Sequence, residues 1–139
     1  MELGVAYAES GRWDAAIDRF QKVLTLDPQF APAHYSLGRV YYSQQKHEEA
    51  ERELLLATRL VPGYVDAFAL LSFVSQEMGD RRGAVTYLEK AVDLLRPRPA
   101  RAKEAGRAPT PLTEDEQALL QRLEGRLEKL KRADAQKAP

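Results

Sequence analysis

The chain has 139 residues, of which 44% are hydrophobic, and it contains no cysteine. A chain of this length forms one domain, or one domain with an appendage, and without cysteine it forms no disulfide and no thiolate metal site. Its 21 basic and 21 acidic residues leave a formal net charge of zero, which argues against the positive field that nucleic-acid-binding proteins usually carry.

Three segments of the chain repeat with a spacing of 34 residues, starting with Leu3, Leu37 and Leu71. Other equivalent sets are Gly4, Gly38 and Ser72; Tyr7, Tyr41 and Ser75; Ala16, Ala50 and Ala84; and Phe20, Leu54 and Leu88. Large and small side chains alternate at spacings of three and four, which indicates helices rather than strands. We expect the small residues to mark close approach of the two helices of a unit. The hairpins should stack, because none can bury its apolar face alone.

Proline and glycine residues divide the repeated region into units. Pro28 and Pro62 end the first two units, because the residue before a proline avoids helical torsions. Gly11 and Gly79 mark tight turns inside the first and third units, where the middle unit has Gln45. The expected units are residues 1–30, 31–64 and 65–97.

The first unit starts four residues late, so its first helix is short by most of a turn. Two explanations are open: the short unit is the natural start, or Met1 is an internal methionine of a longer array. No stretch approaches the roughly eighteen apolar residues of a membrane span, and no signal peptide is visible. We therefore expect no membrane insertion and a cytoplasmic location for the chain as written, unless its N-terminus is truncated.

The last third of the chain changes character. Residues 98–112 are rich in proline, arginine and alanine, and are expected to form an extended linker. Residues 113–133 are expected to form a helix that Thr113 and Glu116 begin with a capping box. Residues 134–139 are expected to form a disordered tail.

One face of the expected C-terminal helix carries a leucine stripe, formed by Leu119, Leu120, Leu123, Leu127 and Leu130. The stripe needs an apolar partner, and three arrangements are open. In the first, the helix caps the third repeat. In the second, it forms a homodimer through a short coiled coil, although two heptads are few for this. In the third, it folds into the chain's own groove or onto a partner.

The repeated pattern resembles the tetratricopeptide repeat (TPR), a helix-turn-helix of 34 residues with large and small side chains at these positions. The resemblance covers residues 1–97. It implies an all-α fold, a TPR-like α-α superhelix of about three repeats, followed by the C-terminal helix. Three residues depart from the family pattern: His34 replaces a large apolar residue, Ser75 a tyrosine and Arg96 a proline.

No cluster of residues in the sequence is typical of catalysis, cofactor binding or metal binding. The repeat pattern places His34 near the core and His47 at the start of a second helix, so they are not expected to converge. The sequence has no glycine-rich phosphate loop and no nucleophile elbow. The basic stretch 98–107 is interrupted by Glu104 and has no aromatic residue on which a base could stack. We expect no enzyme activity, cofactor, metal or nucleic-acid partner.

In TPR proteins the first helices of successive repeats line a concave groove that binds an extended peptide or a partner helix. The resemblance implies these groove positions in this chain: Val5, Ala8, Tyr35, Arg39, Tyr42, Ala69, Phe73 and Gln76. Tyrosine and arginine are common at binding hot spots. The alternatives are that Tyr35 and Phe73 only pack between neighbouring helices, and that Arg39 only pairs with a nearby acid.

TPR domains that bind chaperone tails hold a peptide carboxylate with Lys and Asn side chains. Here Val5 and Ser36 occupy the Asn positions, and Asp66 and Leu70 the cation positions, which argues against that ligand. We expect instead an apolar or aromatic peptide segment that bears an acidic residue. The expected function is a non-catalytic interaction module or scaffold. The alternative is a structural assembly unit whose C-terminal helix caps the array or self-associates.

Overall fold

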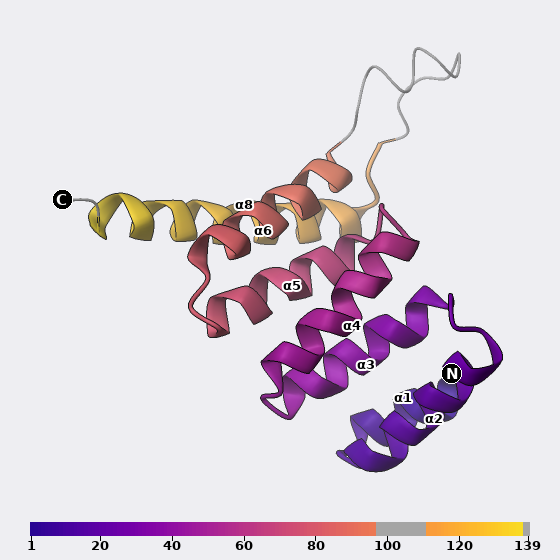
Figure 1. The fold of residues 1–139 in the computed structure, drawn as a ribbon. Helices are drawn as coiled ribbons and strands as arrows, with labels where there is room; N and C mark the ends of the chain where they lie inside the picture. Colours follow the sequence, from indigo (N-terminus) through magenta and orange to yellow (C-terminus); the bar gives the residue numbers. More distant parts are fainter. Residues whose placement is uncertain (97–110, 138–139) are drawn as a thin grey trace.

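The computed structural model describes residues 1–96 and 111–137, and these residues form seven helices and no strand. The helices are α1 (Glu2–Glu9), α2 (Trp13–Leu26), α3 (Ala31–Ser43), α4 (His47–Leu60), α5 (Val65–Glu77), α6 (Arg81–Leu95) and α8 (Glu114–Lys137). Helices α1 to α6 form three hairpins that stack side by side, and α8 lies along α6 (Figure 1). The all-α architecture expected from the sequence is confirmed. No helix in this part of the chain combines the length and hydropathy that crossing a membrane requires.

The two helices of a hairpin approach most closely where the sequence has its smallest residues. A Cβ atom added to Gly38 of α3 would lie 2.6 Å from Cγ of Leu54 on α4. One added to Gly4 of α1 would lie 2.6 Å from Cε1 of Phe20 on α2. Ala50, the small residue expected on α4, is fully buried. The small side chains therefore stand where the helices touch, as the repeat pattern predicts.

Each hairpin turns through one residue whose backbone is left-handed. Gly11 (φ 74°) and Gly79 (φ 80°) serve the first and third hairpins, and Gln45 (φ 60°) serves the middle one. Glycine adopts this conformation without steric cost, whereas a residue with a Cβ atom is disfavoured there by roughly 1–2 kcal/mol. The middle turn is therefore the strained one of the three.

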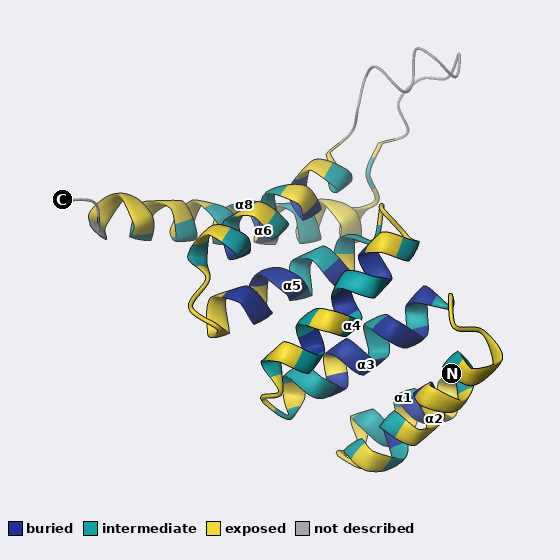
Figure 2. Ribbon diagram, viewed as in Figure 1, coloured by how far each residue is buried: buried dark blue, intermediate teal, exposed yellow. Residues whose placement is uncertain are grey.

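Apolar clusters between neighbouring hairpins hold the stack together. Leu37 on α3 is 2% exposed and Leu71 on α5 is fully buried, because the preceding hairpin covers each of them. Leu3 occupies the equivalent position on α1 and is 49% exposed, since no described hairpin covers that side of α1. The burial pattern in Figure 2 follows this arrangement, with the deepest burial between the helices of the second and third hairpins.

Helix α8 covers the far side of the third hairpin. Its leucine stripe packs against α6, and Leu123 near the middle of the stripe is only 4% exposed. Three ion pairs join α6 and the residue after it to α8: Arg96 with Glu124 at 2.8 Å, Lys131 with Glu89 at 2.6 Å, and Arg81 with Asp134 at 3.6 Å. Among the three arrangements considered for the stripe, the structure shows the cap. A coiled coil with a second copy would need leucines that this packing already uses.

The start of α8 has the expected capping box. The backbone N–H of Glu116 donates to Oγ1 of Thr113 at 3.2 Å, and the backbone N–H of Thr113 donates to Oε2 of Glu116 at 2.9 Å. These reciprocal bonds satisfy two amide groups that the first turn of a helix leaves without an intrahelical partner.

The end of α8 differs from the expectation. The helix continues to Lys137 instead of ending at residue 133, so the expected disordered tail is wrong for residues 134–137. The segment from Ala133 to Lys137 contains neither glycine nor proline, and alanine, glutamine and lysine all favour helix. The expected linker, residues 98–112, lies almost wholly outside the described residues.

Candidate functional site

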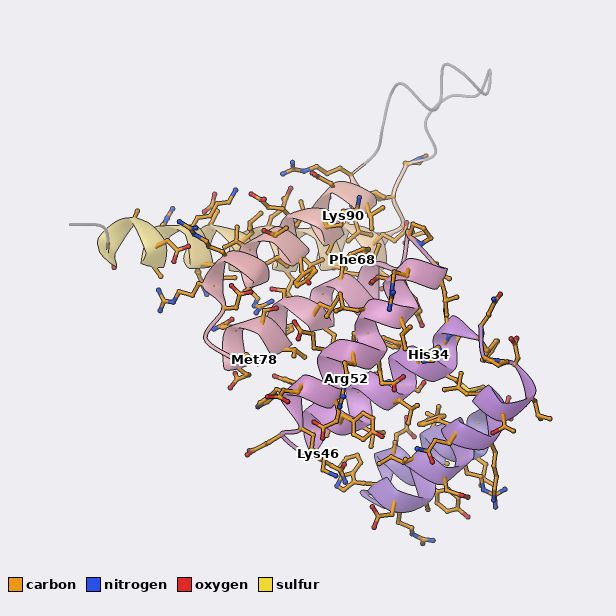
Figure 3. The ribbon with its side chains drawn as sticks, in the orientation of Figure 1. His34, Lys46, Arg52, Phe68, Met78 and Lys90 are labelled. Atoms are coloured by element: carbon orange, nitrogen blue, oxygen red, sulfur yellow. The ribbon has the colours of Figure 1, made fainter. Side chains whose placement is uncertain are left out.

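The two histidines make separate structural contacts. His34 is 8% exposed; its Nδ1 lies 2.7 Å from Oε2 of Glu53 on α4, and its Nε2 donates to the carbonyl oxygen of Pro28 at 3.0 Å. Figure 3 shows His34 on α3 beside α4. The ring of His47 instead lies beside Tyr42, with ring centroids 5.9 Å apart. His34 therefore ties the start of α3 to α4 and to the turn before α3, and the two rings share no site.

A hollow of about 100 Å³ lies between α1, α2 and α3, and we call it the α1–α3 hollow. Val5 and Ala8 line it from α1, Trp13 and Phe20 from α2, and Arg39 from α3. Most of these side chains are apolar, so the hollow suits an apolar group of similar volume. Three of the expected groove residues meet here: Val5, Ala8 and Arg39.

Trp13 and Phe20 were not expected in the groove. The resemblance assigns groove positions to the first helix of each repeat, and both residues lie on a second helix, α2. The short first helix was the available signal that residues of α2 reach the groove. Helix α1 has 8 residues and α3 has 13, so α1 covers a smaller part of α2 than α3 covers of α4.

Arg39 is the cation of the α1–α3 hollow. Among residues 1–96 and 111–137, no carboxylate lies within the 4.0 Å of its guanidinium that an ion pair requires. The guanidinium carbon instead lies 5.9 Å from the centroid of the Tyr35 ring. The ion pair considered as the alternative role of Arg39 is therefore absent from the described part of the chain.

Tyr35 combines packing with exposure to this face. Its ring lies against Tyr64, the residue before α5, with ring centroids 5.0 Å apart and an interplanar angle of 39°. Burial raises the pKa of the Tyr35 hydroxyl; the negative charge of Asp66 raises it further, while Arg39 opposes the rise. The phenol therefore remains neutral and can donate a hydrogen bond at neutral pH.

The three groove residues expected on α5 all lie next to α8. Ala69 packs against the apolar cluster that α6 and α8 share. The guanidinium carbon of Arg126, on α8, lies 3.5 Å from the centroid of the Phe73 ring. The same guanidinium donates through Nη2 to Oε1 of Gln76 at 2.7 Å and through Nη1 to Oγ of Ser72 at 2.9 Å. Phe73 is still 40% exposed, so α8 narrows this part of the face without covering it.

Burial lowers the pKa of the Arg126 guanidinium, and Tyr42 on α3 opposes that change. Phe73 and Gln76 share one face with Arg126. The repeat pattern could not predict this residue, because α8 has no counterpart in the 34-residue alignment; its only signal was its place three positions after Leu123, beside the leucine stripe.

Stacked hairpins of this kind define the class of helical-repeat proteins, which present extended concave surfaces. A family model described as TPR repeat matches residues 4–45, and one described as tetratricopeptide repeat matches residues 31–63. The chain belongs to the tetratricopeptide-repeat family, as its 34-residue spacing predicted. No curated protein sequence matches it.

Several solved structures share the fold. MamA has 30% sequence identity and a TM-score of 0.64; the match covers 75% of this chain, which spans only 57% of the MamA chain. PcrH in complex with the chaperone binding region of PopD has 21% identity and a TM-score of 0.78 over 96% of this chain and 89% of that chain. SycD, a type III secretion translocator chaperone from Yersinia enterocolitica, has 18% identity and a TM-score of 0.78 over 96% of this chain and 82% of that chain. The likeness to PcrH and SycD concerns the fold alone.

Proposed function

We propose that the chain is a non-catalytic protein-interaction module that binds a peptide or a partner helix along the face formed by α1, α3 and α5. The observation that carries this proposal is the α1–α3 hollow, which combines apolar walls with an arginine that makes no ion pair among the described residues, although Glu9 also lines the hollow. The solved complex of PcrH with a segment of PopD supports it, because that fold places a peptide-binding function on the same type of helical stack.

The chemistry of the face indicates what kind of peptide fits. The α1–α3 hollow of about 100 Å³ has room for one aliphatic side chain, and Tyr35, Tyr42 and Phe73 offer partly exposed rings on α3 and α5. Arg39 would pair with an acidic residue next to the apolar anchor. A face of three hairpins buries a limited area, so the affinity is expected to be modest, on the order of micromolar.

The experiment is a selection of random twelve-residue peptides displayed on phage against the full chain, followed by calorimetric titration of the selected peptides. Ala8→Phe fills the hollow from α1 and should lower affinity by about tenfold or more, which corresponds to about 1.4 kcal/mol. Arg39→Ala should lower it by a similar factor for peptides that contain an acidic residue. Ala6→Phe is the matched control, because Ala6 lies on the same helix, is exposed and does not line the hollow.

Two results would contradict the proposal. One is a selection that yields no peptide with an affinity stronger than millimolar. The other is equal affinity of the selected peptides for the wild-type chain and the Ala8→Phe variant, while circular dichroism shows the same helix content in both.

A further inference from the structure

A second hollow lies where the end of α5, the start of α6 and α8 meet. It has a volume of about 530 Å³ and is lined by Gln76 of α5, Gly79 in the turn after α5, Arg81 of α6, and Arg126, Lys129 and Leu130 of α8. We call it the α8 cation site. Three of its lining side chains are cations and none is a carboxylate. The hollow therefore concentrates positive charge in a chain whose formal net charge is zero.

Arg126 is the central cation of this site, and its charge is not neutralised within the described chain. Its guanidinium donates only to the neutral oxygens of Ser72 and Gln76, and one of its faces lies on Phe73. Among residues 1–96 and 111–137, no carboxylate is within 4.0 Å of either Arg126 or Lys129. Because burying a charge without a counter-charge is costly, partly buried arginines are usually paired with an acid. Arg126 has no such ion pair among the residues that the structure describes.

Two carboxylates near the hollow make other contacts. Oδ1 of Asp134 lies 3.6 Å from Nη1 of Arg81. Asp134 is on α8, about two helical turns after Arg126. Asp80 caps α6 and accepts a hydrogen bond from the backbone N–H of Gly83 at 2.9 Å. Asp134 therefore compensates Arg81 in part, while the N-terminus of α6 adds positive potential of its own.

The contacts of Arg126 hold its guanidinium in a fixed position. The hydrogen bonds to Ser72 and Gln76 and the stacking on Phe73 restrict rotation of an otherwise flexible side chain. An arginine fixed in this way loses little further entropy when it binds an anion, which increases the affinity that one ion pair provides.

We propose that the α8 cation site binds a carboxylate of the peptide partner, with Arg126 and Lys129 as its ligands and Arg81 at its edge. The inference rests on the proposed function and specifies it: the partner carries an acidic group at the α8 end of the face, in addition to the apolar anchor in the α1–α3 hollow. The site differs from the carboxylate-binding positions of chaperone-binding TPR domains, which Val5, Ser36, Asp66 and Leu70 occupy in this chain.

The direct test uses the acetylated and amidated peptide of four glutamates as the probe, titrated into the full ¹⁵N-labelled chain. The expected result is a saturable shift of the Nε–Hε NMR signal of Arg126. The corresponding peptide of four glutamines should produce no such shift. Inorganic phosphate at matched ionic strength distinguishes a carboxylate site from a general anion site, and it should bind at least about tenfold more weakly. An equal response to phosphate, or no response to the glutamate peptide, overturns the proposal.

Variants assign the binding to this hollow. Lys129→Gln should weaken binding of the glutamate peptide by about threefold or more, and Arg126→Gln by about tenfold or more. Arg122→Gln is the matched control, because Arg122 lies exposed on the same helix and does not line the hollow. If Arg126→Gln displaces α8, Lys129→Gln still decides the question, since Lys129 makes no ion pair or side-chain hydrogen bond in the described chain. Equal losses for Lys129→Gln and Arg122→Gln contradict the assignment.

The outcomes separate this inference from the function on which it rests. If selected peptides lose affinity for the Ala8→Phe variant but the glutamate peptide leaves the Arg126 signal unchanged, the α8 cation site is wrong and the interaction module stands. If the Arg126 signal shifts but no selected peptide depends on Ala8, the α1–α3 hollow is wrong as the peptide anchor.

Discussion

Gly38 provides a quantitative test of how closely α3 and α4 approach. In a Gly38→Ala variant the new methyl group would lie 2.6 Å from Cγ and 2.8 Å from Cδ2 of Leu54, and 3.4 Å from the carbonyl oxygen of Ala50. Leu54 is fully buried, so it has little room to move away. Overpacking of this kind costs about 1–3 kcal/mol, and the gain in helix propensity offsets about 1 kcal/mol of it. We therefore expect a net loss of up to about 2 kcal/mol.

Gly125 on α8 is the matched control. A Cβ atom added there would have no neighbour within 4 Å, so Gly125→Ala should show the propensity gain alone, about 1 kcal/mol of added stability. The two variants make the same chemical change in the middle of a helix. They should therefore move stability in opposite directions.

The measurement is urea unfolding followed by far-ultraviolet circular dichroism. Gly38→Ala should lower the urea midpoint and Gly125→Ala should raise it, with the same dependence on urea concentration in both, because the surface exposed on unfolding barely changes. If Gly38→Ala were as stable as Gly125→Ala, the close approach of α3 and α4 would be wrong.

Three further substitutions test other features by the same measurement. Ser75→Ala should raise stability by about 1 kcal/mol, because this serine is 1% exposed and its Oγ has no hydrogen-bond partner among the described residues; a loss would mean that Oγ is bonded. Leu123→Ala should lower stability by about 2–5 kcal/mol and speed amide exchange in α8 more than in α3. Gln45→Gly should gain about 1 kcal/mol by removing left-handed strain. Gln44→Gly, at φ −85°, is its control and should show no gain.

The repeat pattern was sufficient to predict the hairpins. Gly38 and Ala50 each belong to a set of small residues that recurs every 34 positions, and close packing of two helices explains why these positions stay small. The capping box of Thr113 and Glu116 was equally local, so it could be predicted from four consecutive residues. Local rules of this kind need no knowledge of the remaining fold.

The position and end of α8 were harder to predict. A leucine stripe indicates that a helix has an apolar partner, but not which surface that partner is, so capping, self-association and docking in the groove or on a partner all remained open, although two heptads are few for a coiled coil. The end at Lys137 was not predicted either; in the folded chain Asp134, in the last turns of α8, lies 3.6 Å from Nη1 of Arg81. Such a contact between distant segments cannot be seen in the sequence alone.

The candidate site was predictable only where it repeats. Val5 and Arg39 follow from the 34-residue alignment, and both line the α1–α3 hollow. Trp13 and Arg126 do not, because one lies on a second helix and the other on a helix outside the repeats. Residues that the repeat pattern does not describe therefore contribute largely to the chemistry that distinguishes this face from the same face of another repeat protein.

The stacking order has a consequence for how the molecule opens. Helices α1 to α6 each contact mainly the helices next to them in the chain, and α8 mainly contacts α6, so an end can unfold without disrupting the opposite end. The first hairpin has a described neighbour on one side only, whereas the third lies between the second hairpin and α8. Transient fraying would thus remove the α1–α3 hollow while the α8 cation site stays intact. A partner bound at both places would lock the frayed end and slow its exchange with solvent.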